Sequence, residues 1–444
     1  MVDKRRKDNS GDKNTMDTKP VTAVIVGGGH RSFIYADYSL SHPEALKIVG
    51  IADPNTERCA AAAEKFGFSK EFCFSSAEEL AKQPKLADAI INGTMDHQHF
   101  ETAAPLLEKG YDMLLEKPFA CSAEEMQKLL AIVRKNGNKV MVCHVLRYAA
   151  FYLEIKKRLI NGEIGDIINI QTVENVSYHH LSTSYVRGKW ANSDICKTSM
   201  LLAKSCHDID IMTWLMFPVK PERVSSFGGK FQFRPENAPE GAGTRCLLDC
   251  PYVDTCRYSA KDMYLGHPER WAFYAWTEFE GRNDVTTEEK EQSLRTNNPY
   301  GRCIYKCDNN VVDHQSVLVE FENGATGTHN MVGGTASSGR SLHITGTKGE
   351  IFGDFESGRF TISHIMNDHP DGFMNEEVDT AAGEGHGGGD EALIADFTNF
   401  VRTGEQSVSC TSIYNSVAGH LTVFLADKSR EEGGTPQVCD YSKY

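Results

Sequence analysis

Three consecutive glycines, Gly27 to Gly29, stand where an apolar run ends and a helix-like segment begins. With Ser32 they form the pattern Gly27-x-Gly29-x-x-Ser32, in which serine replaces a third glycine. Glycine lets the backbone approach a pyrophosphate, and the N–H groups that open the next helix, at His30 and Arg31, then face the phosphate charge. The pattern predicts a dinucleotide site; the alternative is an ordinary strand–turn–helix without a nucleotide.

A second apolar run, Leu46 to Ala52, ends at an acidic residue, Asp53. Asp53 lies 21 positions beyond Ser32. A carboxylate at this distance can accept hydrogen bonds from the adenosine ribose, and its charge would repel a 2′-phosphate. We therefore expect NAD as the cofactor in preference to NADP.

Glu116, Lys117 and Pro118 end a further apolar run that reads as a buried strand, 112–116. In open α/β sheets, ligands bind beyond the carboxyl ends of the strands, which places Glu116 and Lys117 beside the cofactor. A desolvated lysine can act as a base near neutral pH, and as a cation it can polarise a substrate oxygen. The alternative is a solvated lysine at the end of a strand.

His207 is the second candidate acid or base. Lys204, His207 and Asp208 share one face of an otherwise apolar helix by their spacing of three and four residues. Burying ionisable groups on such a helix costs free energy, which is tolerated where the groups have a function. We therefore expect catalytic roles for these three residues. The alternatives are a core histidine with satisfied hydrogen bonds and an Asp208–Lys204 pair that is only structural; Asp210 reads as structural or interfacial.

Aromatic and basic residues that suit a carbohydrate gather in one stretch of the chain. Aromatic faces stack on sugar C–H bonds, and arginine donates to hydroxyls. The expected substrate-binding residues are Tyr178, His179, Arg187 and Trp190. An exposed loop with a packed tryptophan is the alternative.

Thirteen cysteines are present, and five of them, Cys246, Cys250, Cys256, Cys303 and Cys307, fall in one irregular region. Thiolates gathered in this way can fold around a structural zinc ion. Buried free thiols and a disulfide are the alternatives, and five residues compete for four places. The other cysteines are expected to act as small buried hydrophobic residues. We expect no catalytic metal.

The elements that must position these residues fall into two patterns. From 21 to 148, strands alternate with helices, which predicts a doubly wound parallel sheet. From 149 to 444, longer alternating strands and an Asn323-Gly324 hairpin signal predict an α/β domain with a large open, mostly antiparallel sheet. Residues 234–310 read as an irregular cysteine-rich insertion, and residues 1–20 as a disordered tail.

The bulk composition excludes several classes of partner. The formal net charge is -14 and there is no apolar run of bilayer length, so we expect neither nucleic acid nor membrane as a partner. No signal-peptide pattern opens the chain, which favours a cytoplasmic protein.

The nucleotide motif, the Glu116-Lys117-Pro118 strand end and the helix around His207 together resemble the Gfo/Idh/MocA oxidoreductase family. This resemblance covers about residues 20 to 430. It implies a Rossmann domain, a second α/β domain whose sheet often forms oligomer contacts, and reversible oxidation of a sugar, polyol or glycoside hydroxyl with NAD(P). A homo-oligomer formed through the C-terminal sheet is therefore expected.

The resemblance also assigns individual residues. Thr94 and His99 match a family turn that lies along the cofactor, and Arg147 matches an arginine after the last Rossmann strand that we assign to the substrate. His386 and Asp390 stand where relatives bring a histidine and an acid to the substrate, although a glycine-rich turn and a helix cap explain them nearly as well. Ala203 departs from the family, which often has aspartate there.

Three functions follow as hypotheses. The first is an NAD-dependent dehydrogenase acting on a carbohydrate hydroxyl, with Lys117 and His207 as acid and base groups. The second is an NAD-dependent glycosidase that oxidises a hydroxyl transiently and then eliminates the leaving group. The third is a nucleotide-binding protein without catalysis.

Overall fold

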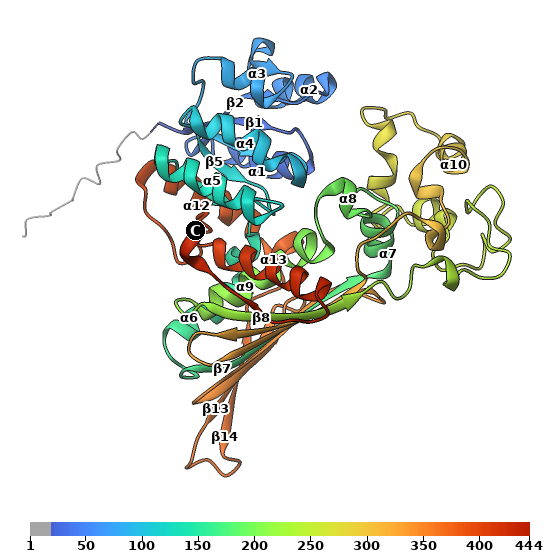
Figure 1. The fold of residues 1–444 in the computed structure, drawn as a ribbon. Coiled ribbons are helices and arrows are strands. Elements are labelled where there is room, and N and C mark those ends of the chain that lie inside the picture. The colour runs from blue at the N-terminus through green and yellow to red at the C-terminus, as the bar shows by residue number, and fades with distance from the viewer. Residues whose placement is uncertain (1–18) are drawn as a thin grey trace, which may run out of the picture.

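The computed structural model describes residues 19–444, leaving aside the side chains of residues 384 and 385. The tail predicted for 1–20 therefore lies, except for Lys19 and Pro20, outside the described residues. Two sheets organise the rest of the chain, one above the other in Figure 1.

The first sheet is parallel throughout, with the strand order β3-β2-β1-β4-β5-β6. Its order reverses between β1 and β4, which is the switch point where doubly wound sheets bind ligands. This confirms the predicted Rossmann architecture. The strands are β1 (Val21–Val26), β2 (Leu46–Ala52), β3 (Cys73–Phe74), β4 (Ala89–Asn92), β5 (Asp112–Leu115) and β6 (Val140–Val142).

Five helices connect these strands. Side chains of Asn55, Ser76 and Ser122 cap three of them, and glycines in the left-handed conformation end α2 and α5. The helices are α1 (His30–Ser41), α2 (Thr56–Phe66), α3 (Ala77–Lys82), α4 (His99–Glu108) and α5 (Ala123–Asn136).

The second sheet has nine strands in the order β14-β13-β12-β11-β7-β10-β9-β8-β15. All pairs are antiparallel except β7 with β10, and Gly324 turns the predicted hairpin between β9 and β10. The open, mostly antiparallel sheet is therefore confirmed. Its strands are β7 (Ile167–Ser177), β8 (Pro221–Gly229), β9 (His314–Phe321), β10 (Thr326–Thr335), β11 (Gly339–Gly346), β12 (Gly349–Asp354), β13 (Arg359–Ile365), β14 (Phe373–Asp379) and β15 (Gln437–Val438).

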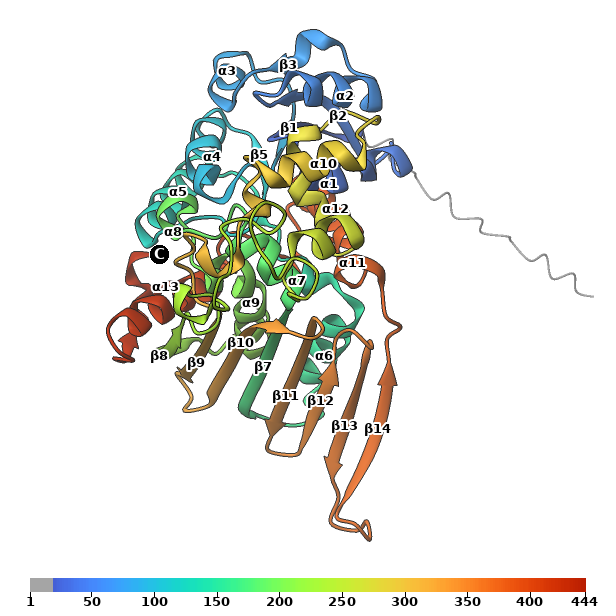
Figure 2. The ribbon, with the colours of Figure 1, turned by 90° about the vertical axis from the view of Figure 1, so that its right-hand side faces the viewer.

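Three helices, α6 (Ala150–Ile160), α9 (Cys206–Met216) and α13 (Val417–Glu431), lie between this sheet and the first domain (Figure 1). Every residue of α9 is buried, because it is covered by the sheet on one side and by α6 and α13 on others. Figure 2 looks onto the other face of the sheet, whose lower half no described helix covers. Two short helices, α7 (Tyr178–Leu181) and α8 (Ser193–Cys196), follow β7.

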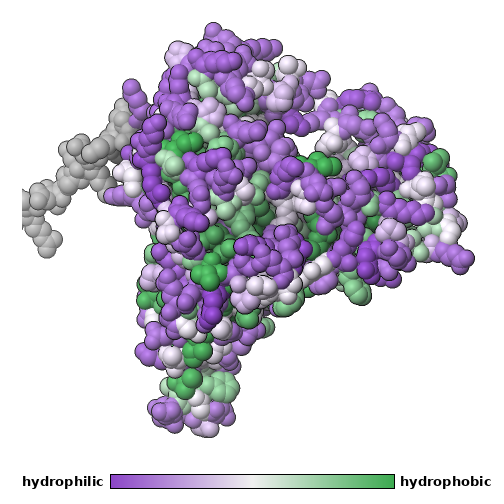
Figure 3. All heavy atoms as spheres, viewed as in Figure 1, coloured by the Kyte–Doolittle hydropathy of each residue, from purple (hydrophilic) through white to green (hydrophobic). Residues whose placement is uncertain are grey.

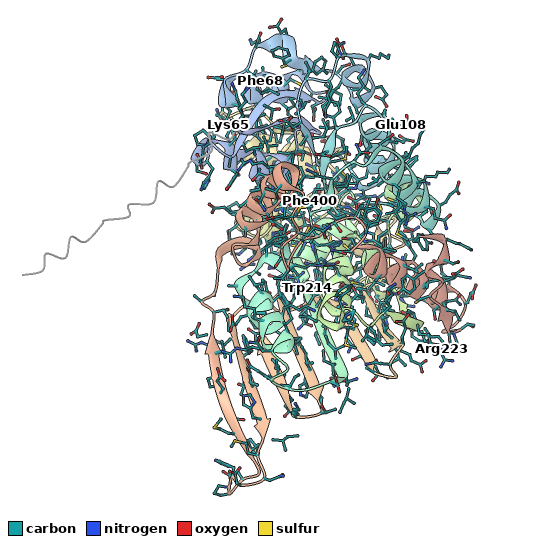
Figure 4. All side chains as sticks on the ribbon, turned by 90° about the vertical axis from the view of Figure 1, so that its left-hand side faces the viewer. Lys65, Phe68, Glu108, Trp214, Arg223 and Phe400 are labelled. Atoms are coloured by element: carbon teal, nitrogen blue, oxygen red, sulfur yellow. The ribbon has the colours of Figure 1, made fainter. Side chains whose placement is uncertain are left out.

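The chain returns late to the first domain. Helix α12 (Gly389–Thr403) follows the short α11 (Glu384–Gly387), and it buries Leu393 and Phe397 in one cluster with residues of β1 and β2. Met141 of β6 then pairs with Ser412. Figure 4 shows Phe400 of α12 between the first domain above and Trp214 of α9 below. Residues 411–413 bond to β6 and residues 413–416 form a turn, so α13 begins only at Val417.

The insertion, 234–310, holds one regular α-helix, α10 (Thr287–Arg295), with short helical turns around it. In Figure 1 it lies beside the first domain, on the right of the view. Arg58, at the start of α2, pairs with Glu280 of the insertion at 2.6 Å, and the rings of His30 and Phe273 are 6.1 Å apart. The insertion therefore contacts the first domain close to the glycine turn.

Among the described residues, no helix combines the length and the apolar character needed to cross a bilayer.

Candidate active site

The glycine turn has the backbone that a nucleotide site requires. Gly27 has φ of +78°, and a Cβ there would lie 2.8 Å from the backbone nitrogen of Thr94. Ser32, fully buried, donates from Oγ to Gly27 O at 2.6 Å and packs against Gly93. Serine therefore serves as the small third residue of the motif, and Gly29 caps α1 with no side chain over its open N–H groups.

Asp53 lies directly beside this turn. Its two carboxylate oxygens accept hydrogen bonds from Gly28 N at 2.6 Å and from Asn55 N at 2.7 Å. Each oxygen retains a free lone pair, so the side chain can still accept from a ribose hydroxyl. The position fits the predicted role in selecting NAD.

The Thr94 turn approaches from β4. His99 is fully buried and holds two loops together, with Nδ1 2.6 Å from Pro118 O and Nε2 3.1 Å from Thr94 O. Its imidazole thus supports the turns that carry Thr94 and Lys117. The structure favours this supporting role over a direct contact with the cofactor.

Glu116 and Arg31 link the end of β5 to α1. Arg31 Nε donates to Glu116 at 3.0 Å, and its Nη2 contacts Asp390 at 2.5 Å. Tyr35 donates to the same Glu116 oxygen at 2.8 Å. Burial opposes ionisation of Glu116, but the charges of Arg31 and Lys117 outweigh it and lower its pKa.

Lys117 reaches from the first domain into the second. Its Nζ donates to Ala203 O at 2.7 Å. Ala203 lies one helical turn before His207, in a π-helical turn, Leu201–Ser205, that opens into α9. The position where relatives carry aspartate thus receives the lysine through its backbone carbonyl.

His207 is buried, with 7% of its surface exposed, and its Nδ1 has no hydrogen-bond partner among the described residues. Burial, followed by the nearby charges of Lys117, His144 and His386, lowers its pKa well below the ordinary value. The imidazole is therefore neutral at pH 7 and available to accept a proton. Its ring lies 5.7 Å from that of His144 and 6.0 Å from that of His386.

Lys204 and Asp208 enter a buried charge cluster instead of contacting His207. Lys204 pairs with Glu174 of β7 at 2.8 Å, and Arg340 of β11 pairs with Glu174 at 2.7 Å and with Asp208 at 2.9 Å. The two cations balance the two anions. The alternative Asp208–Lys204 pair is replaced by this arrangement, in which Asp208 bonds Arg340 and the cluster positions the helix.

His386 and Asp390 do come to the site, as the resemblance implied. His386 Nδ1 lies 3.2 Å from Asp390, which also binds Arg31. Burial acts against the charged carboxylate, but the hydrogen bond from His386 and the charge of Arg31 lower the pKa of Asp390. A chain of polar groups thus runs from α1 through Asp390 and His386 to His207.

An aromatic group flanks these residues. Trp190 donates from Nε1 to Asp96 at 2.9 Å, and its ring lies 6.2 Å from that of Tyr274. His180 stacks on Trp271 at 3.8 Å. Trp271 and Tyr274 belong to the insertion and were missed from the sequence, although their aromatic run WAFY was visible.

Tyr178 and His179 stand farther along the same side. The Tyr178 hydroxyl accepts from Arg270 of the insertion at 3.1 Å, and its ring meets that of His179 edge-on at 5.2 Å. Both side chains are half-buried. They remain candidates for substrate contact.

The two arginines expected to bind substrate make structural contacts instead. Arg147 is 2% exposed and makes a two-pronged ion pair with Asp210 of α9, at 2.7 and 2.5 Å. Arg187 is 1% exposed and donates to Tyr258 O and Arg302 O in the insertion. Neither guanidinium is free for a sugar hydroxyl, whereas the structural role expected for Asp210 is confirmed.

Asp210→Ala is expected to lower the free energy of unfolding by about 3–5 kcal/mol, because it leaves Arg147 buried without its partner. Chemical denaturation followed by circular dichroism measures this change. The matched control is Asp194→Ala at an exposed position of α8, which we expect to cost below about 0.5 kcal/mol. A cost for Asp210→Ala no larger than that of the control would contradict the structural role of the pair.

All thirteen cysteines are free thiols, so the disulfide alternative is wrong for the cysteine-rich region. Zinc fits no better: thiolates around zinc lie about 3.8 Å apart, and among the described residues no three of the thiols lie within 4.8 Å of one another. The group that does meet this spacing is Glu163, His364 and Glu376, which are partly exposed and far from these cysteines in sequence.

Family profiles cover most of the chain. The profile described as "Oxidoreductase family, NAD-binding Rossmann fold" matches residues 21–144, and "Oxidoreductase family, C-terminal alpha/beta domain" matches residues 156–408. The chain belongs to the Gfo/Idh/MocA oxidoreductase family. The glycine turn and Asp53 lie within the first of these matches and His207 within the second.

Several named proteins are similar to the chain at low sequence identity. The YteT protein of Bacillus subtilis (strain 168) is 24% identical over 365 residues, covering 79% of this chain and 81% of its own. D-glucoside 3-dehydrogenase of Escherichia coli (strain K12) is 26% identical, over 35% of this chain and 43% of its own. Levoglucosan dehydrogenase in complex with NADH and levoglucosan shares the fold, with a TM-score of 0.68, 18% identity, and coverage of 95% and 100%.

Proposed function

We propose that this protein is an NAD-dependent dehydrogenase that oxidises a hydroxyl of a sugar, polyol or glycoside. The observation that carries the proposal is the hydrogen bond from Lys117 Nζ to Ala203 O, which brings an ammonium group of the first domain to the turn before His207. The names of D-glucoside 3-dehydrogenase and levoglucosan dehydrogenase support a carbohydrate substrate.

In this reaction the residues of the chain would have separate acid–base and charge-stabilising roles. Lys117 donates to the substrate oxygen and stabilises the negative charge that develops there. His207, kept neutral by burial, accepts the hydroxyl proton. The His386–Asp390 pair lies next to His207 and stabilises the positive charge that His207 then carries. When bound, NAD supplies the acceptor for the hydride that leaves the carbon.

The residues present fit NAD. The glycine turn, Thr94 and the open N–H groups of α1 would hold its phosphates, and Asp53 its adenosine ribose. Trp190, Tyr274 and Trp271 would provide apolar faces for a sugar ring.

A panel assay tests the function directly. The purified chain is given NAD and a set of sugars, polyols and glycosides, and the absorbance of reduced nicotinamide is followed. We expect NADH formation with at least one of these compounds. Bound NAD, shown by mass spectrometry of the denatured protein, without turnover of any hydroxyl compound would count against dehydrogenation.

A redox-neutral glycosidase is the second candidate, and two observations favour it. The family aspartate is Ala203, and the Arg58–Glu280 pair brings the insertion over the first domain near Asp53, which suits a retained cofactor. Oxidation of one ring hydroxyl acidifies the neighbouring C–H; loss of that proton expels the aglycone, water adds, and the hydride returns. Aglycone release without net NADH, with solvent deuterium entering the sugar, would favour this candidate, and absence of exchange would exclude it.

Asp53→Asn is expected to shift the ratio of kcat/KM for NAD over NADP by roughly tenfold toward NADP, about 1.4 kcal/mol, because the charge that repels a 2′-phosphate is removed while a hydrogen-bond acceptor stays. Initial rates with both cofactors measure the ratio. Asp37→Asn, on the exposed side of α1, serves as the control. An unchanged ratio would show that Asp53 does not select the cofactor.

The open face of the second sheet supports a homo-oligomer. Leu318, Val332, Phe352 and Ile365 are all at least 40% exposed on it, and Figure 3 shows apolar side chains along the lower part of the molecule. We expect Phe352→Glu combined with Leu318→Glu to convert an oligomer to monomers in sedimentation velocity. Ile195→Glu, an exposed apolar site on α8, is the control; a monomeric wild type would overturn the assignment.

A further inference from the structure

Four cysteines of the insertion surround one space. Cys246, Cys250, Cys256 and Cys303 line a cavity with an empty volume of about 330 Å³, part of it open to solvent. Three of the thiols come from one loop, and the fourth comes from a segment 47 residues beyond Cys256. The fold therefore gathers thiols that the sequence keeps apart.

The backbone fixes these two segments against each other. Cys246 N donates to Gly301 O at 2.9 Å, and Cys303 N donates to Thr244 O at 2.8 Å. Cys307, the fifth cysteine of the region, does not line the cavity; its thiol donates to Cys303 O at 3.3 Å. The structure thus selects four thiols from the five that the sequence offered.

The space among the thiols is larger than one metal ion needs. Zinc would draw four thiolates to about 3.8 Å from one another, and here no three described thiols lie within 4.8 Å. Four separated thiols around one cavity match a group whose several metal atoms each take one thiolate.

A buried positive charge faces the same cavity. Arg187 is 1% exposed and lines it, with Nη2 3.6 Å from Cys246 Sγ. Its other contacts are carbonyl oxygens, the Tyr264 hydroxyl and Met263 sulfur, and no described carboxylate lies within 4.0 Å of it. A fully buried guanidinium requires a negative partner, and an anionic metal–thiolate group would supply it.

We propose that Cys246, Cys250, Cys256 and Cys303 hold a [4Fe–4S] cluster, one thiolate on each iron, with Arg187 balancing its negative charge. The cluster would tie the two ends of the insertion together. Trp271 and Tyr274, which flank the candidate active site, lie in the chain between those ends. The cluster is thus placed to brace the substrate side of the site, and this inference does not depend on the proposed reaction.

The test uses the full chain, purified without oxygen and then supplied with ferrous iron, sulfide and a thiol reductant. We expect about four iron atoms and about four sulfides per chain, together with the broad visible absorption of an iron–sulfur cluster that bleaches on exposure to air. A chain that holds no iron, about two irons, or a single zinc ion would overturn the assignment.

Matched variants locate the ligands. Cys256→Ser is expected to lower the iron content at least several-fold, whereas Cys307→Ser, four residues from Cys303 but outside the lining of the cavity, should keep it. Circular dichroism establishes that each variant is folded. Equal loss of iron in both folded variants, or loss in neither, would show that the four thiols are not the ligands.

Discussion

Lys117→Met is expected to lower kcat by roughly 10²- to 10⁴-fold, about 3–5 kcal/mol of transition-state stabilisation. Methionine keeps much of the length and the apolar stem of lysine but cannot donate to a substrate oxygen. The hydrogen bond from Lys117 Nζ to Ala203 O is also lost, so the variant has no ammonium group beside the turn that leads to His207. Steady-state kinetics on a substrate from the panel measure the change.

Binding of NAD separates a catalytic role from a structural one. We expect the Kd of NAD for Lys117→Met to stay within a few-fold of the wild type, because the glycine turn and Asp53 are untouched. Lys128→Met, at an exposed position of α5, should leave both kcat and Kd unchanged. If Lys117→Met and His207→Ala both bind NAD and retain full activity, the catalytic assignment is wrong, and a non-catalytic nucleotide-binding protein becomes the better account.

The free energy of unfolding is expected to fall as the pH drops below about 6.5, which is above the range in which carboxylates usually titrate. Burial first, and then neighbouring positive charges, lower the pKa of His144, His180, His207 and His420 well below 6.5. In the unfolded chain each takes up a proton near pH 6.5, while in the folded chain each stays neutral. Stability is therefore complete above that pH and is lost as the pH falls below it.

From pH 7.5 to 5.5 each of these histidines lowers the free energy of unfolding by about 1.4 kcal/mol, and the four together by about 5.5 kcal/mol. Burial raises the pKa of Asp210 and Glu174, and their protonation acts in the opposite direction at lower pH. Urea denaturation at a series of pH values between 5.5 and 7.5 measures the slope.

His420→Asn should reduce this slope by about a quarter, and the same change at exposed His97 should leave it unaltered. His420 accepts a hydrogen bond from Phe119 N at 3.2 Å, so some loss of stability at neutral pH accompanies the first variant. A pH-independent free energy of unfolding over this range would contradict burial of the four neutral rings.

The parts of the fold that sequence predicts well are those with a strong local pattern. The parallel strands around Gly27 and Asp53 are continuous apolar runs, and their elements lie within a few residues of the predicted ranges. Strands β8, β13 and β14 were not predicted, because their sequences are polar or mixed; β14 is an edge strand, FMNEEVD, with no buried side chain. Only pairing with β13 defines it.

The candidate site divides in the same way. The Lys117 and His207 positions follow from motifs, but their partners depend on which strands become neighbours. Glu174 and Arg340 meet Lys204 and Asp208 because β7 and β11 pair in one register, which no local pattern encodes.

The roles of Arg147 and Arg187 also depend on partners that the local sequence does not reveal. Arginine after a Rossmann strand, or beside aromatic residues, suits a sugar hydroxyl as well as it suits an ion pair. The acceptors that decide the matter, Asp210 for Arg147 and backbone carbonyls of the insertion for Arg187, lie 63 or more residues away in the chain.

The late return of the chain to the first domain bears on how the protein is made. Leu393 and Phe397 of α12, together with the segment that pairs with β6, complete a core whose other half ends near residue 148. A ribosome adding about 5–20 residues per second needs some tens of seconds to cover that interval. During synthesis the nucleotide-binding domain therefore stays incomplete for that time, with an apolar surface exposed. We expect a fragment that ends near residue 148 to expose the same surface and to need chaperones for solubility.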